Sequence, residues 1–116
     1  MSHFKELPEF TDEFKRLLKK YRSLEIDRTK LERLLTQHPT GAGKNFTIVH
    51  VEVDVKIVKT RMACQSLRDR SIRVVYAYHE DVVEFMYIEV YAKGDKENED
   101  RERIKQYLKD RKQENL

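Results

Sequence analysis

The feature that most constrains the fold is an alternating segment in the middle of the chain. From Val49 to Ile57 the odd positions are apolar and the even positions are polar. This period of two is typical of a β-strand with one face buried. Beyond Ile57 the phase inverts, because Val58 and Met62 become the apolar positions. A one-residue slip exchanges the two faces of a strand, so the sequence predicts one long strand, ending near Ala63, with a β-bulge near Ile57 and Val58.

Cationic side chains accompany this strand and the next one: Lys56, Lys59, Arg61, Arg68, Arg70 and Arg73. With a bulge near Ile57, the first three would share one face. The net charge is only +3 although 39% of the residues are charged, so the basic character is local. Several positive charges on rigid strands indicate a surface for polyanions. Alternatively, these charges keep an edge strand from aggregating, and Arg73 pairs with Glu84 or Glu89 across a hairpin.

Two amphipathic helices are predicted before the strands. The first begins after Pro8, and its apolar side chains repeat at helical spacing: Phe10, Phe14, Leu17, Leu18 and Tyr21. The second follows Ser23 and ends at residues 38–41, His-Pro-Thr-Gly, where proline and glycine disfavour helix. Its buried seam would consist of four leucines: Leu24, Leu31, Leu34 and Leu35. Together the two helices form a hairpin whose apolar side needs a cover.

A β-hairpin and a last helix complete the predicted fold. Residues 71–78 and 82–91 are rich in branched and aromatic side chains and are separated by a short polar turn, which predicts antiparallel strands. Residues 3–7 are a candidate for one more strand. The last helix, from about residue 97 to 112, has a thin apolar stripe and therefore little packing to hold it.

The expected fold class is α+β in a single domain spanning residues 1–116. It consists of an N-terminal helical hairpin packed on an antiparallel sheet of three to four strands, with a C-terminal helix. A chain of this length can bury one modest core.

Several classes of site and location are disfavoured by composition. Cys64 is the only cysteine, and the four histidines lack the spacing of metal ligands, so we expect no metal site and no cofactor. No apolar run approaches the ~20 residues of a membrane span. The first residues do not look like a signal peptide. We therefore expect a cytoplasmic protein.

The order of these elements, together with short motifs, resembles the RelE/ParE superfamily of type II toxins, which are paired with antitoxins. The motifs are Phe14–Tyr21, Val55–Arg61, Ile72–Tyr76 and Ile88–Lys93. In that family a strand reading "basic residue, two hydrophobic residues, Tyr" and a closing "Tyr-x-Lys" segment recur in this order. The resemblance covers most of the chain.

The resemblance implies a ribosome-dependent mRNA endoribonuclease that inhibits translation, with a cognate antitoxin as protein partner. In the implied reaction the ribose 2′-hydroxyl attacks the adjacent phosphate. Arg73 corresponds to the family's transition-state arginine, whose planar fork suits phosphate oxygens. Lys59, Arg61 and Lys93 are the other catalytic candidates. RNA-binding roles are implied for three further cations: Lys56, Arg68 and Arg70.

The chain also departs from that family. Active relatives often carry a catalytic tyrosine or histidine in the C-terminal segment, whereas residues 94–100 here contain neither. General acid–base catalysis contributes about 10²–10⁴-fold, so its absence would leave a slow or inactive enzyme. Two alternatives therefore stay open. One is a ParE-like inhibitor of DNA gyrase, and the other is a catalytically decayed protein that binds partners through the same fold.

Overall fold

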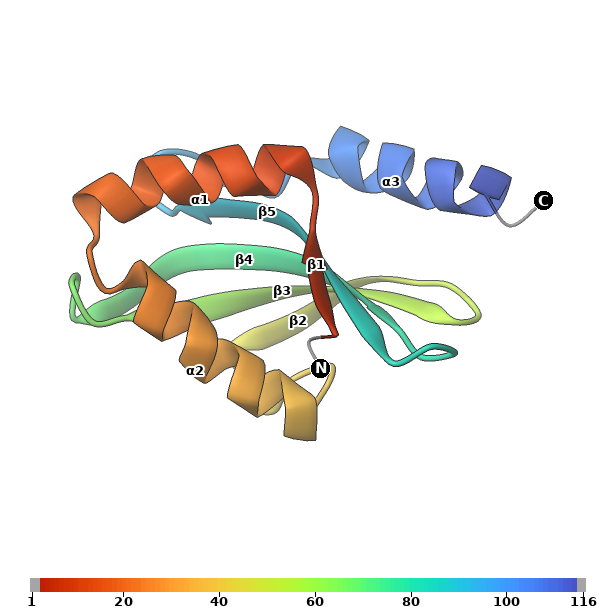
Figure 1. Ribbon diagram of the computed structural model, residues 1–116, viewed down its shortest axis with the longest axis horizontal. Helices are drawn as coiled ribbons and strands as arrows, with labels where there is room; N and C mark the ends of the chain where they lie inside the picture. The colour runs from red at the N-terminus through yellow and green to blue at the C-terminus, as the bar shows by residue number, and fades with distance from the viewer. Residues whose placement is uncertain (1–2, 115–116) are drawn as a thin grey trace.

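The structure is a computed structural model, which describes residues 3–114 (Figure 1). Its elements, in chain order, are β1 (Phe4–Glu6), α1 (Pro8–Lys20), α2 (Leu24–Gln37), β2 (Phe46–Val51), β3 (Val55–Cys64), β4 (Asp69–His79), β5 (Glu84–Ala92) and α3 (Arg101–Glu114). The α+β class, the helical hairpin and the C-terminal helix are confirmed.

A single five-stranded sheet runs through the molecule in the order β1-β5-β4-β3-β2. All neighbours are antiparallel except β1, which pairs parallel to β5. The sheet is thus larger than the three to four strands that were predicted, because residues 3–7 do contribute a strand and because residues 49–63 are divided between two strands.

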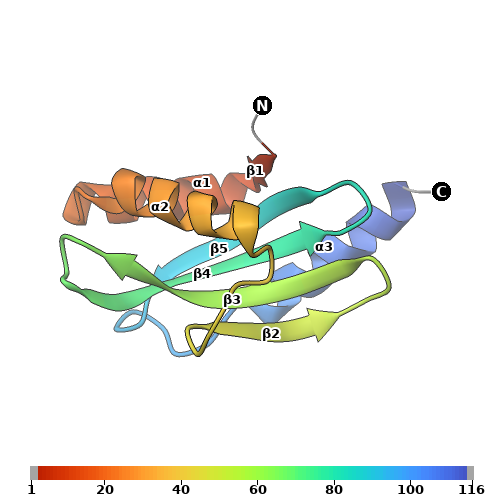
Figure 2. The same cartoon turned by 90° about the horizontal axis from the view of Figure 1, so that it is seen from below.

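Both faces of the sheet are covered, each over part of its length. Figure 2 shows the α1–α2 hairpin on one face and α3 on the other. Under the hairpin, Phe10, Phe14 and Leu35 pack on inward-facing residues of β3 to β5, among them Val58, Met62 and Tyr76. Under α3, Ile104 and Leu108 pack on a second cluster that includes Val55, Ile57, Val75 and Ile88. The thin stripe predicted for α3 is therefore buried at two positions.

The prediction of one long strand is wrong, because its residues belong to two strands, β2 and β3. Residues 52–54 form a tight turn in which the Glu52 N–H donates to the Val55 carbonyl oxygen at 2.8 Å, so β2 and β3 are two strands of a hairpin. The irregularity lies in β2, between Ile48 and His50, and β3 continues without interruption through Ile57 and Val58. The phase inverts because α3 covers the first part of β3 and the hairpin covers the rest.

A second correction concerns the seam of α2. Leu24, Leu31 and Leu35 are buried as predicted, but Leu34 is 38% exposed. It lies on the flank of the helix, above the end of β3, where no other element of the described chain covers it.

The far half of α3 is held at the tips of the two hairpins by a buried histidine and two ion pairs. His79, at the end of β4, is buried and bonds the Tyr107 hydroxyl through Nε2. Arg111 reaches Asp54 at 3.7 Å and Asp81 at 3.6 Å. Burial lowers the pKa of His79, and the charge of Arg111 adds to this, whereas the nearby carboxylates oppose it.

We expect acidification to destabilise the protein through His79. Its folded-state pKa lies below the ordinary value of about 6.5. The unfolded chain therefore binds more protons as pH falls below about 6.5, and stability drops until pH passes the folded-state pKa. Urea midpoints measured at pH 7.5 and 5.5 should differ for the natural chain. The difference should shrink in His79→Gln and persist in His38→Gln, which changes an exposed histidine; an equal pH dependence in all three proteins would contradict the assignment.

Within residues 3–114, no helix combines the length and the apolar character that crossing a membrane requires.

Candidate phosphate-binding site

A depression of about 510 Å³ opens on the α3 face of the sheet, at the end where β5 stops. We call it the cationic depression. It is lined by residues of β2 to β5 and of the segment that leads to α3: Asn45, Thr47, Lys59, Arg61, Arg73, Tyr91, Lys93, Gly94, Asp95, Lys96 and Glu97. Three of the four residues that sequence reasoning placed in catalysis, Lys59, Arg61 and Arg73, lie on its floor, and the fourth, Lys93, lies on its rim.

Strand register brings these side chains together. Arg73 on β4 lies directly opposite Arg61 on β3 and directly opposite Tyr91 on β5. Lys59 is two residues before Arg61 and therefore lies on the same face. Lys93 follows β5, and its N–H donates to the Ser71 carbonyl oxygen at 2.9 Å, which holds it beside β4. Lys56, three residues from Lys59 on an uninterrupted strand, lies on the opposite face, so the predicted common face of Lys56, Lys59 and Arg61 is wrong.

The pairing of Arg61 with Arg73 is unfavourable for stability, because like charges directly opposite on neighbouring strands repel. Neither guanidinium, nor the Lys93 ammonium, has an ion-pair partner among residues 3–114. Arg73 instead donates to the Arg70 carbonyl oxygen, and the glutamates proposed to pair with it across the hairpin lie elsewhere. Three cations without an ion-pair partner among residues 3–114 therefore face one concave surface, which Asp95 and Glu97 also line.

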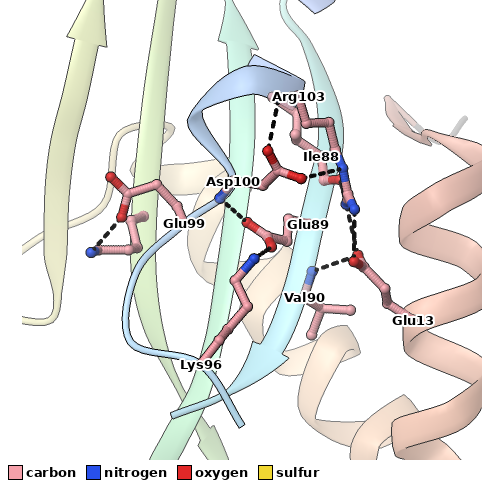
Figure 3. Close-up of polar contacts among 9 residues, drawn as sticks. Glu13, Ile88, Glu89, Val90, Lys96, Glu99, Asp100 and Arg103 are labelled. Carbon is pink, nitrogen blue, oxygen red and sulfur yellow. Dashed lines mark hydrogen bonds and ion pairs between the residues drawn. The ribbon is translucent and has the colours of Figure 1, made fainter. Parts of the chain in front are cut away.

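The two remaining lysines are neutralised by buried carboxylates. Lys59 Nζ lies 2.9 Å from Glu99, and Lys96 bonds Glu89, which is 1% exposed (Figure 3). Burial raises the pKa of Glu99, but the hydrogen bond and charge of Lys59, a backbone hydrogen bond and the charge of Arg101 together outweigh this and lower it. Each ammonium is thus held by a negative charge, so these lysines order the site and add little net charge to it.

The same network fixes the start of α3 on the sheet (Figure 3). Glu89 also accepts from the Asp100 N–H at 2.8 Å, and the Asp100 carboxylate accepts from the Arg103 N–H at 3.0 Å, which caps the helix. Arg103 then forms two 2.9 Å hydrogen bonds to Glu13 of α1 and one to the Ile88 carbonyl oxygen. The rim of the cationic depression is therefore rigidly connected to both α1 and α3.

Tyr91 is a residue of the site to which the sequence analysis assigned no functional role. Its side chain is 6% exposed and lines the cationic depression next to Arg73. Its hydroxyl makes no hydrogen bond with any other group of residues 3–114. Burial, aided by Glu89 and Glu99, raises its pKa to about 12, so the phenol is protonated at neutral pH. The "Tyr-x-Lys" spacing was the available signal, because residues two apart on a strand share a face.

The three cations predicted to bind RNA are not gathered in the cationic depression. Lys56 lies at the other end of β3 and pairs with Glu80. Arg68 is in the turn between β3 and β4, with φ of 56°, and lines a different groove. Arg70 lies between the two surfaces, since its side chain donates to the Arg61 carbonyl oxygen and its own carbonyl oxygen accepts from Arg73.

No three His, Cys, Asp or Glu side chains of the described residues cluster as a metal site would require. Comparisons with protein-family models, curated proteins and solved structures returned no match to this chain.

Proposed function

We propose that the protein is a RelE-like toxin that cleaves mRNA on the ribosome and is neutralised by a cognate antitoxin in the cytoplasm. The observation that carries the proposal is the unpaired set of Arg61, Arg73 and Lys93 on a concave surface. Two arginines directly opposite each other on neighbouring strands destabilise the fold when no carboxylate pairs with them. A phosphodiester would supply the missing negative charge, and the open depression leaves room for a nucleotide backbone.

The proposed chemistry is attack of the ribose 2′-oxygen on the adjacent phosphorus, with the 5′-oxygen leaving. Arg73 and Arg61 donate to the phosphate oxygens as negative charge builds up on them, a role that guanidinium groups keep at any working pH. The Tyr91 phenol lies opposite Arg73 in the strand register and is protonated at neutral pH, so we assign to it the protonation of the leaving 5′-oxygen. Among the lining groups, the carboxylates of Asp95 and Glu97 can accept the 2′-proton.

Induced expression in a bacterial host, followed by mapping of RNA ends, tests the proposal. We expect translation to stop and new 5′-hydroxyl ends to accumulate within codons of translated messages. Growth arrest without new RNA ends, accompanied by broken or supercoiling-deficient DNA, would instead support the gyrase inhibitor.

That second candidate has one observation in its favour. Both lysines on the floor and wall of the site, Lys59 and Lys96, are tied to buried glutamates. They are therefore poorly suited to proton transfer, which a protein acting by binding alone does not need.

Removing the Tyr91 hydroxyl should change stability and activity in opposite directions. Tyr91→Phe deletes a buried oxygen that lacks a hydrogen-bond partner in the described chain, so the free energy of unfolding should rise by about 1 kcal/mol. If the phenol protonates the leaving group, RNA cleavage should fall about 10²-fold. Urea denaturation and single-turnover cleavage on programmed ribosomes measure the two effects. Tyr78→Phe, a change of the same type outside the depression, should leave cleavage intact.

A further inference from the structure

A second concavity, which we call the α2 groove, lies on the opposite face of the sheet from the cationic depression. It has a volume of about 520 Å³ and runs between α2 and the last residues of β3. Its apolar floor is formed by Leu31, Leu34, Phe46, Met62 and Ala63. Leu34 is 38% exposed here, so the apolar stripe of α2 is wider than the surface that the sheet covers.

The residues that line the α2 groove include more cations than anions. Its rim carries four cations, Lys30, Arg61, Arg68 and Arg70, and none of them has an ion-pair partner among residues 3–114. The two acidic residues that also line the groove have local partners. Asp27 is buried and accepts from the Ser23 hydroxyl at 2.7 Å, while Asp69 accepts from the Ser71 N–H at 3.0 Å.

One polar group on the floor is also unsatisfied. The Thr60 side chain is 1% exposed and lines the α2 groove, and its hydroxyl has no hydrogen-bond partner among residues 3–114. A buried hydroxyl without a partner costs about 1–3 kcal/mol. That oxygen is shielded from solvent, whereas Leu34 is open, so an occupant that packs apolar side chains against Leu34 would bury apolar surface.

We propose that the α2 groove is the docking site for an acidic segment of a partner protein that also carries apolar side chains. Charge complementarity to four unpaired cations requires the acidic residues. The apolar floor requires apolar side chains, and it disfavours nucleic acid, whose backbone offers little for Leu34 or Met62 to contact. Protein docking sites combine an apolar centre with a polar rim in this way.

Arg61 connects this docking site to the proposed function, because it lines both the α2 groove and the cationic depression. A carboxylate of the docked segment that pairs with Arg61 withdraws that guanidinium from a phosphate on the other face. Partner binding therefore weakens RNA binding, and RNA weakens partner binding by the same factor. This coupling rests on the proposed function, whereas docking itself does not.

A display library of random 12-residue peptides, selected on the full chain, tests the docking site. We expect the enriched peptides to combine acidic with apolar residues and to lose at least tenfold in affinity for Leu34→Glu and for Arg68→Asn. Both positions are exposed, and asparagine suits the positive φ of residue 68, so both variants should fold. Lys93→Gln, in the cationic depression, is the matched control and should bind the peptides normally. Enriched peptides without an acidic bias, or peptides indifferent to Leu34→Glu, would overturn the proposal, as would an α2 groove that selects no peptide.

A competition experiment tests the coupling separately. An enriched acidic peptide should lower the affinity of the chain for a single-stranded RNA oligonucleotide several-fold, and Arg61→Gln should abolish this effect. Peptide binding that leaves RNA affinity unchanged would overturn the coupling. A chain that binds the peptide but cleaves no RNA on programmed ribosomes would instead refute the proposed function, with the docking site intact.

Discussion

Replacing Arg73 by glutamine should abolish toxicity and leave the fold at least as stable as before. The loss of a pre-organised cation at a developing phosphate charge costs about 10²–10³-fold in rate. The same change relieves the repulsion from Arg61 across the strand pair, which is worth about 0.2–1 kcal/mol. Glutamine keeps an N–H donor for the Arg70 carbonyl oxygen that Arg73 now contacts. Single-turnover cleavage on programmed ribosomes and urea denaturation should therefore move in opposite directions.

The matched control is Arg16→Gln. Arg16 is an exposed arginine of α1 that lines neither the cationic depression nor the α2 groove, and it has no ion-pair partner among the described residues. This variant loses the same charge and should retain full toxicity. Full toxicity of Arg73→Gln would refute the assignment of the cationic depression to RNA cleavage. A parallel loss of stability and activity would show that Arg73 is a packing residue.

Helices and inner strands were predictable because their patterns are local. Phe10, Phe14 and Leu17 repeat along α1 at helical spacing and are all buried in the structure. The β2–β3 hairpin was missed because its turn, residues 52–54, contains no glycine, proline or asparagine and because Val53 continues the apolar alternation. Val53 is 102% exposed, at the tip of the turn, so its place in the alternation carried no information about burial.

The floor of the candidate site was also largely predictable, whereas its electrostatics were not. The common location of Lys59, Arg61 and Arg73 could be predicted. Strand alternation places Lys59 and Arg61 on one face, and the antiparallel β3–β4 pairing places Arg73 opposite Arg61. Lys59 is neutralised by Glu99, which lies in the segment before α3, whereas Arg61 and Arg73 have no ion-pair partner among the described residues. Glu99 is 40 residues from Lys59 in sequence. No local pattern indicates a contact over that separation. Acidic residues before a helix are typical of a solvent-exposed helix N-terminus, so they did not predict a buried ion pair.

The largest loss of stability should come from the ion pair that joins α1 to α3, some distance from the cationic depression. Arg103→Met removes both hydrogen bonds to Glu13 and the hydrogen bond to the Ile88 carbonyl oxygen. The largely buried Glu13 carboxylate then keeps only a weak 3.3 Å contact with the Val90 N–H. Breaking a buried pair from one side typically costs about 3–5 kcal/mol; because both side chains retain some exposure here, we expect about 3 kcal/mol.

The exposed neighbour of Arg103 gives a matched control for this effect. Arg101, on the same turn of α3, is 78% exposed, and its guanidinium comes no nearer than 3.5 Å to Glu99. Because exposed ion pairs contribute little, Arg101→Met should change the free energy of unfolding by less than about 1 kcal/mol. Urea denaturation of both variants measures the difference, and hydrogen exchange of α3 amides locates it. Because Glu13 and Arg103 belong to the first and last helices, loss of the pair should expose α3 before the sheet. Equal effects of the two substitutions would mean that the Glu13–Arg103 pair adds nothing to the attachment of α3.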